Sequence, residues 1–145
     1  MIREADQKDW VELMRLYRQL NSDEAVFADG RDRAVFEQIL GQDGLFLFVL
    51  ESAGKLVSTC YLNVIPNLTR SAMPYAVIEN VVTYEARRGR GFGKRVIEHA
   101  VLQAWALGCY KVMLMTGSKE ESTHAFYRSC GFSAKEKQAY VIRQP

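Results

Sequence analysis

Residues 75–108 read YAVIENVVTYEARRGRGFGKRVIEHAVLQAWALG, which sets a strand pattern, a glycine-rich basic turn and a helix pattern in direct succession. The segment from Tyr75 to Thr83 is rich in Val and Ile, the residues that favour strands. From Gly91 onward the apolar residues recur at three- and four-residue spacing up to Gly108, and a glycine at that place is typical of a helix end. The order predicts a strand that passes into a helix through a glycine-rich junction.

The junction, residues 87–95, combines five basic side chains with three glycines at alternate positions. Glycines allow a tight turn and the close approach of a ligand to the backbone, and the first amides of a helix favour an anion. A phosphate or pyrophosphate is therefore the expected ligand. The residues that we expect to contact it are Arg88, Gly89, Arg90, Gly91, Phe92, Gly93 and Lys94.

Other interpretations of the glycine-rich junction must be weighed against a phosphate site. A P-loop needs four residues between its first glycine and its Gly-Lys pair, whereas Gly89 and Gly93 enclose three, and the dinucleotide fingerprint places its third glycine one residue later. An ordinary turn with a solvated basic rim is possible. An RNA-binding Arg/Gly segment would lie in a flexible tail, and this one lies between two predicted elements.

The rest of the chain alternates between strand and helix patterns without repeats or a linker. Strand and helix patterns in this order predict a mixed α/β sheet with at least one parallel crossover. The stripe Trp10, Met14 and Tyr17 is interpreted as core. Strands are predicted at residues 2–4, 45–51, 55–65, 75–83, 110–115 and 139–142, and helices at residues 10–20 with Asp6 as N-cap, 34–40, 91–107 and 121–129.

Composition narrows the classes of protein further. A chain of 145 residues with 48% hydrophobic residues fits one globular domain, residues 1–145. A net charge of +2 is too small to suggest a nucleic-acid or membrane partner. Three scattered cysteines and two histidines offer no metal spacing, so no metal is expected. The acidic start and the absence of a long apolar run predict a cytoplasmic protein.

Two motifs together resemble the GNAT superfamily of acyl-CoA N-acyltransferases, and the resemblance covers nearly the whole chain. The segment Arg88 to Gly93 is similar to the family's Gln/Arg-x-x-Gly-x-Gly/Ala signature, and Phe126 to Phe132 is similar to its later Tyr-x-x-x-Gly-Phe motif. Residues 77–82 and 108–112 look in particular like the glucosamine-phosphate N-acetyltransferase branch. Glu120 stands where the family often has Asn, and this departure concerns the acceptor more than the donor.

The resemblance implies a GNAT-like, partly parallel central sheet flanked by helices, and acetyl-CoA as the acyl donor. In the family, backbone amides of the turn bind the pyrophosphate of coenzyme A. A base like Glu79 accepts the proton of the amine, and a tyrosine like Tyr127 serves the leaving thiolate. The backbone of Val81, Val82 and Thr83 corresponds to the segment that pairs with the pantetheine arm, and a homodimer paired through C-terminal strands is implied.

Each of these residues also has a plain structural explanation. Glu79 could be an ion-pairing residue on a strand, Tyr127 could pack against Phe126 and Phe132, and His124 is more simply a helix-surface residue. Turnover is expected to acetylate a small primary amine, with an inactive acyl-CoA-binding module as the alternative. The acceptor is expected between residues 21–31 and 66–70. The acidic Asp23, Glu24 and Asp29 favour a cationic amine, while Arg70 and Lys111 leave a phosphorylated amino sugar possible.

Overall fold

The strand and the helix expected around the glycine-rich junction are present as β4 (Tyr75–Thr83) and α4 (Phe92–Ala106). The computed structural model describes residues 1–21, 27 and 29–145, which form two units, Met1–Leu114 and Met115–Pro145. The single domain expected for residues 1–145 stays a prediction. The first unit also holds β1 (Ile2–Glu4), η1 (Gln7–Asp9), α1 (Trp10–Leu20), α2 (Arg31–Gly41), β2 (Leu45–Ser52), β3 (Lys55–Ile65), α3 (Thr69–Ala72), η2 (Glu85–Arg87) and β5 (Val112–Leu114), and the second holds α5 (Glu121–Ser129).

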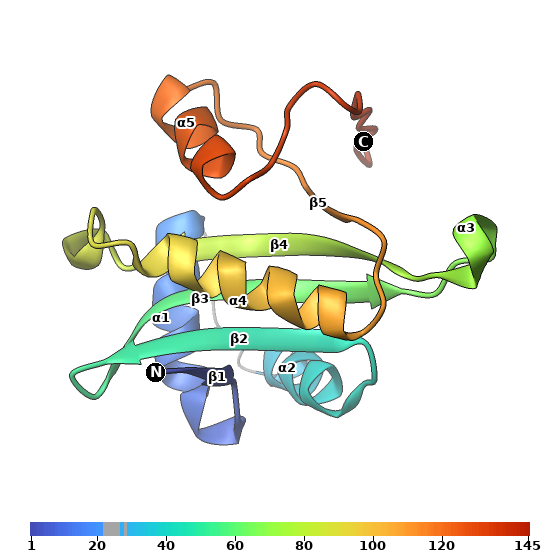
Figure 1. The fold of residues 1–145 in the computed structure, drawn as a ribbon. Coiled ribbons are helices and arrows are strands. Elements are labelled where there is room, and N and C mark those ends of the chain that lie inside the picture. The colour runs from blue at the N-terminus through green and yellow to red at the C-terminus, as the bar shows by residue number, and fades with distance from the viewer. Residues whose placement is uncertain (22–26, 28) are drawn as a thin grey trace. The chain divides into compact units, whose positions relative to one another are not determined.

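The strands of the first unit form a five-stranded sheet in the order β1-β2-β3-β4-β5 (Figure 1). Neighbouring strands are antiparallel up to β4, and β4 pairs with β5 in parallel, with α4 as the crossover between them. The expected mixed and partly parallel α/β sheet is confirmed. Parallel neighbours need such a long connection, and an amphipathic helix provides it while covering one face of the sheet.

Helices cover the two faces of the sheet, α4 on one side and α1 with α2 on the other (Figure 1). On the α4 side the Cys60 thiol lies 3.6 Å from the carbonyl oxygen of Val96, and the Phe48 ring lies 4.7 Å from the His99 ring. The opposite face buries a second cluster that includes Leu13, Leu16, Phe36, Leu47 and Val49. A sheet with both faces covered explains why β2 has four buried residues in succession.

The first helix begins with a reciprocal cap. The Asp6 side chain accepts a hydrogen bond from the amide of Lys8, and the Asp9 side chain accepts one from the amide of Asp6. The expected N-cap therefore starts η1, which continues directly into α1. At the end of α1 Leu20 is 52% exposed, whereas Leu16 is fully buried.

Two predicted strands need correction. The strand expected at residues 110–115 is shorter, Val112–Leu114, because it pairs with β4 over three residues only. Its residues are half-buried, not buried. Residues 139–142 form no strand, and Tyr140 and Ile142 are 90% and 98% exposed. A strand needs a hydrogen-bonded neighbour, and strand propensity alone does not supply one. In the part of the chain that the structure describes, no helix has the length and apolar character to cross a membrane.

Candidate active site

The glycine-rich junction forms an open N-terminus for α4. Gly91 occupies the N-cap position with a φ of +79°, and no side chain caps this helix. Gly89 also has a positive φ, +77°, and a Cβ placed at either glycine would meet no atom within 4 Å. The first amides of a helix have no acceptor within the helix, so this end can receive an anion from solvent.

Basic side chains surround this open end. Arg88 and Arg90 are exposed, and the Arg88 Nε donates a hydrogen bond to the carbonyl oxygen of Thr83 at the end of β4, at 3.2 Å. The Lys94 ammonium lies 3.9 Å from the Glu98 carboxylate one turn along α4, and both side chains are exposed enough for water to weaken the pair. Free amides, positive φ glycines and neighbouring cations fit a pyrophosphate, as the sequence predicted.

A β-bulge interrupts β4 just before the junction. The register passes from Tyr61 opposite Glu79 to Thr59 opposite Val82, so β4 holds one more residue than β3 between these pairs. Asn80 takes up the extra residue with a φ of +52°, a conformation that Asn tolerates better than most residues. Strand β5 pairs only with residues 76–78, so in the described sheet the later part of β4 has β3 on one side and no strand on the β5 side.

The side chains around the bulge differ in their surroundings. Val82 is 5% exposed and belongs to the core on the α1 and α2 face, and the Thr83 hydroxyl lies 3.0 Å from the Ser58 hydroxyl. Val81 is half-buried. These side chains are thus occupied in packing, while the backbone of residues 79–83 has no strand partner on the β5 side, and its Val82 and Thr83 carbonyl oxygens accept hydrogen bonds from the side chains of Ser58 and Arg88. That arrangement fits a segment that pairs through its backbone.

Glu79 lies opposite Tyr61 in the β3–β4 pair, so the two side chains occupy the same face of the sheet. Its side chain is half-buried, and within the described residues its carboxylate has no ion pair and no hydrogen bond. The structure therefore gives no support to the interpretation of Glu79 as an ion-pairing residue. A carboxylate of this kind is available to accept a proton from a ligand.

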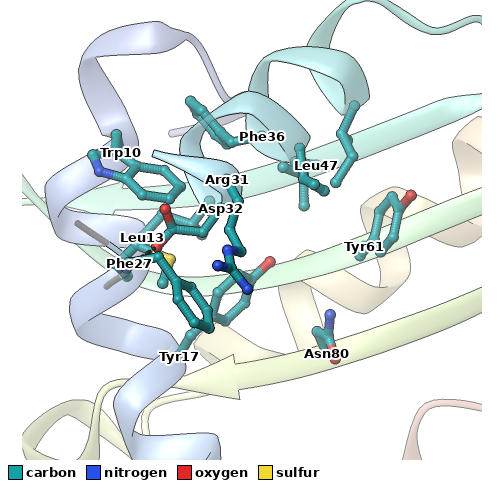
Figure 2. A pocket seen from close by; sticks show the side chains of 13 residues that line it. Trp10, Leu13, Tyr17, Phe27, Arg31, Asp32, Phe36, Leu47, Tyr61 and Asn80 are labelled. Carbon is teal, nitrogen blue, oxygen red and sulfur yellow. Dashed lines mark hydrogen bonds between the residues drawn. The ribbon is translucent and has the colours of Figure 1, made fainter. Parts of the chain in front are cut away.

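A cavity of about 420 Å³ opens beside the bulge, between α1, α2 and the sheet (Figure 2). Burial raises the pKa of the Tyr17 and Tyr61 hydroxyls, so both stay neutral at ordinary pH. Phe27 and Arg31 come from the segment where the acceptor was expected. The lining consists of Trp10, Leu13, Met14, Tyr17, Phe27, Arg31, Asp32, Val35, Phe36, Ile39, Leu47, Tyr61 and Asn80.

The other segment expected at the acceptor site does not line this cavity. Residues 70–72 form a left-handed turn, and the Arg70 guanidinium lies over the Tyr110 ring at 5.1 Å. The Asp29 carboxylate accepts three hydrogen bonds from the Arg31 guanidinium, and Asp23 and Glu24 lie outside the described residues. Trp10, Met14 and Tyr17, interpreted from the sequence as core residues, also line the cavity in the structure. The spacing of apolar residues on a helix is the same whether they face packed side chains or a cavity.

Tyr127 lies on α5, in the second unit. Its ring is 5.2 Å from that of Phe126 and 6.4 Å from that of Phe132, so the packing contacts expected from the sequence are present. His124 is half-buried, and its Nε2 lies 3.0 Å from the carbonyl oxygen of Ser118. Glu79 and the glycine-rich junction belong to the first unit. The assignment of Tyr127 to the chemistry thus rests on its motif.

Comparison with known proteins agrees with the donor site. The model of the acetyltransferase (GNAT) family matches residues 10–132, which include the junction, the bulge and Tyr127. The chain belongs to this family. A glucosamine 6-phosphate N-acetyltransferase 1 from Oryza sativa subsp. japonica is 38% identical over 109 residues, which are 73% of this chain and 64% of the rice protein. The chain therefore matches less than two thirds of that relative's length.

Solved structures of GNAT proteins share the fold over the whole chain. A protein of Agrobacterium tumefaciens str. C58 that is assigned as an acetyltransferase has a TM-score of 0.94 and 48% identity, with 99% of each chain covered. The glucosamine-6-phosphate N-acetyltransferase of Arabidopsis thaliana has a TM-score of 0.84 and 28% identity, covering 99% of this chain and 98% of its own.

Proposed function

We propose that this chain transfers the acetyl group of acetyl-CoA to a primary amine of a small molecule. The observation that carries the proposal is the uncapped N-terminus of α4, where Gly89 and Gly91 hold the backbone open to an anion. Membership of the GNAT family and relatives named as N-acetyltransferases support it. Acetyl-CoA supplies the acetyl group as a reactive thioester.

The residues of the junction and the bulge would hold the donor. The amides at the start of α4 bind the pyrophosphate, helped by Arg88, Arg90 and Lys94. The open backbone of residues 81–83 pairs with the pantetheine arm, which takes the place of a neighbouring strand. This pairing directs an amide of β4 at the acyl carbonyl, where negative charge develops during attack by the amine.

Two side chains would manage the protons. An amine must lose a proton to attack, and Glu79 accepts it directly or through a water molecule. Tyr127 donates a hydrogen bond or a proton to the departing sulfur, which would otherwise leave as a poorly stabilised thiolate. The cavity beside Asn80 receives the acceptor, because it adjoins the strand that carries Glu79.

The direct test measures free thiol release from acetyl-CoA with a panel of primary amines, and mass spectrometry of the product identifies the acetylated compound. Glucosamine 6-phosphate belongs in the panel because relatives are named for it. Turnover of at least one amine supports the proposal. Saturable binding of acetyl-CoA without turnover across the panel would favour an inactive acyl-CoA-binding module instead.

We also propose a homodimer. The exposed apolar side chains of Tyr140, Val141 and Ile142 follow one another in a segment of high strand propensity that has no strand partner in the described structure. A second copy could supply that partner. Light scattering coupled to size-exclusion chromatography should give twice the chain mass of 16.5 kDa, and a monomer mass would contradict the dimer.

A further inference from the structure

We infer that the acceptor is a primary amine on an apolar group about the size of phenylethyl, rather than a phosphorylated amino sugar. The inference rests on the proposed function, because it assumes that the cavity beside Asn80 receives the acceptor. Three observations carry it: the chemistry of the cavity wall, the engagement of its charged groups, and the location of the other cations.

The wall of the cavity is mainly hydrocarbon. Of the thirteen lining residues, five are aromatic and five are aliphatic. Phe36 and Tyr17 lie on opposite sides of the space in Figure 2, with Tyr61 on the sheet side and Asn80 at the lower end. Apolar walls with few polar groups are typical of sites that bury an apolar ligand, because burial of its surface drives binding.

The charged groups of the wall are already engaged with protein partners. Three hydrogen bonds of 3.1, 3.0 and 2.6 Å join the Arg31 guanidinium to the Asp29 carboxylate, and the guanidinium lies 4.4 Å from the centre of the Phe27 ring. The Asp32 carboxylate accepts hydrogen bonds from the amides of Phe27 and Arg33. Arg31 would have to give up or share its carboxylate partner to bind a phosphate, and this cost is small because both side chains are more than half exposed.

Two other cations, Lys111 and Arg70, lie at the far end of β4. The Lys111 ammonium lies 5.2 Å from the centre of the Tyr75 ring, and Arg70 lies over Tyr110. Tyr75 precedes Asn80 by five residues, and an extended strand places them about 16 Å apart. Closer to the cavity, the Arg33 guanidinium lies 5.5 Å from the centre of the Trp10 ring and 3.6 Å from the Glu37 carboxylate, so among the described residues both Arg31 and Arg33 already have carboxylate partners that a phosphate would have to displace.

The position of the bulge orients the acceptor. Asn80 is the polar group of the wall that β4 contributes, and Glu79 is its neighbour in the chain. An acceptor with its apolar body between α1 and α2 would leave its amine at Asn80, within reach of the strand that carries the proposed base. The surrounding hydrocarbon disfavours the charged ammonium, and so favours the neutral amine that attacks.

The test compares 2-phenylethylamine with glucosamine 6-phosphate as acceptors. We expect kcat/KM for 2-phenylethylamine to exceed that for glucosamine 6-phosphate by at least about tenfold. A preference for glucosamine 6-phosphate would overturn the inference and leave the proposed N-acetyltransferase function intact. Failure of every amine together with normal binding of acetyl-CoA would count against the proposed function itself.

A matched pair of variants tests whether the cavity sets this preference. Val35 lines the cavity and is 52% exposed, whereas Val11 is 73% exposed on α1 and does not line it. Val35→Arg adds a cation to the wall and should shift the ratio of the two kcat/KM values toward glucosamine 6-phosphate by about tenfold. Val11→Arg should leave the ratio unchanged, and equal effects of the two variants would overturn the inference.

A binding measurement makes the inference independent of turnover. The chain has two tryptophans, and of these Trp10 lines the cavity. In a Trp105→Phe background the remaining indole emission should change saturably with 2-phenylethylamine and not with glucosamine 6-phosphate. Such a change without turnover would keep the apolar ligand class and reject the enzymatic role. No change with 2-phenylethylamine would reject the ligand class.

Discussion

At the scale of single residues, Glu79 and Tyr127 differ in what supports them. Glu79 has structural support, since its half-buried carboxylate lacks a protein partner among the described residues and lies beside the bulge. Tyr127 has the support of its motif alone, because its ring contacts with Phe126 and Phe132 also fit a packing residue. Removing one functional group from each separates chemistry from packing.

Glu79→Gln should lower turnover on the order of a hundredfold near neutral pH, because the amide cannot accept the proton of the amine. Activity should partly recover at higher pH, where more of the acceptor is already neutral. The measurement is the pH profile of kcat/KM for the acceptor. Glu85→Gln, which changes an exposed carboxylate six residues later, is the control and should behave as the wild type. If Glu79→Gln has the same pH profile of kcat/KM as the wild type, Glu79 has a structural role and is not the base.

Tyr127→Phe removes the hydroxyl and keeps the ring that packs with Phe126 and Phe132. Loss of a hydrogen bond to developing negative charge costs about 1.5 to 3 kcal/mol, so kcat should fall on the order of tenfold to a hundredfold. Acetyl-CoA affinity and the melting temperature should change little. Tyr140→Phe, at a tyrosine that is 90% exposed in the same unit, is the control. Wild-type turnover with chemistry rate-limiting would reject the role of Tyr127.

At the scale of elements, the junction combines a strand end, a turn and a helix start into one binding surface. Gly91→Ala should raise the Kd for acetyl-CoA by about tenfold, or roughly 1.4 kcal/mol, because a Cβ hinders both the positive φ and the approach of a phosphate. Gly54→Ala in the β2–β3 turn is the matched control. Gly54 has a φ of +73° and equally open surroundings. Gly54→Ala should therefore lower the stability of the fold and leave the Kd for acetyl-CoA unchanged. Equal affinities in the two variants, measured by calorimetry, would contradict the donor site.

The start of α1 is held by an ion pair that should make stability depend on pH. The Arg3 guanidinium donates hydrogen bonds of 2.6 and 2.9 Å to the Asp9 carboxylate, which is 6% exposed, and these bonds with the amide of Asp6 hold the pKa of Asp9 below its usual value. A lowered pKa stabilises the fold above the unfolded-state value of about 3.9, and that stability is lost as the pH falls through the folded-state pKa.

Asp9→Asn should therefore lower the free energy of unfolding at pH 7 by about 1.5 to 3 kcal/mol, because Arg3 loses its carboxylate. The deficit relative to the wild type should shrink as the pH falls below about 4. Urea unfolding at several pH values measures both effects. The exposed Asp43→Asn serves as the control and should change neither. A deficit that is constant down to acidic pH would show that the pair contributes through packing alone.

At the scale of the whole molecule, the three cysteines report on the two units separately. Cys60 is fully buried and Cys109 is 7% exposed in the first unit, while Cys130 is half-buried in the second. Burial raises the pKa of Cys60 to about 12, which leaves little reactive thiolate at pH 8. A disulfide-exchange reagent should modify Cys130 first and reach Cys60 only as the first unit unfolds. Simultaneous modification of all three in native protein would contradict the buried core.

Patterns within one segment were sufficient for much of the fold, including the strand and the helix on either side of the proposed donor site. The bounds predicted for Tyr75–Thr83 and Glu121–Ser129 are those of β4 and α5, and two of the three glycines of the junction, Gly89 and Gly91, have a positive φ. Residues 139–142 show where such patterns fail. Strand propensity there is high, but pairing is a property of a neighbour, and the described structure offers none.

The sequence by itself determined the order of elements and the glycine-rich junction proposed to bind an anion, because helix periodicity, strand composition and glycine conformation are local properties of the chain. Only the tertiary structure decided the bulge at Asn80, the isolation of the Glu79 carboxylate and the cavity beside them. Each depends on how separate segments meet: the bulge on the register of β4 against β3, and the cavity on the space left between α1, α2 and the sheet. That space is what distinguishes an acceptor site from an ordinary core.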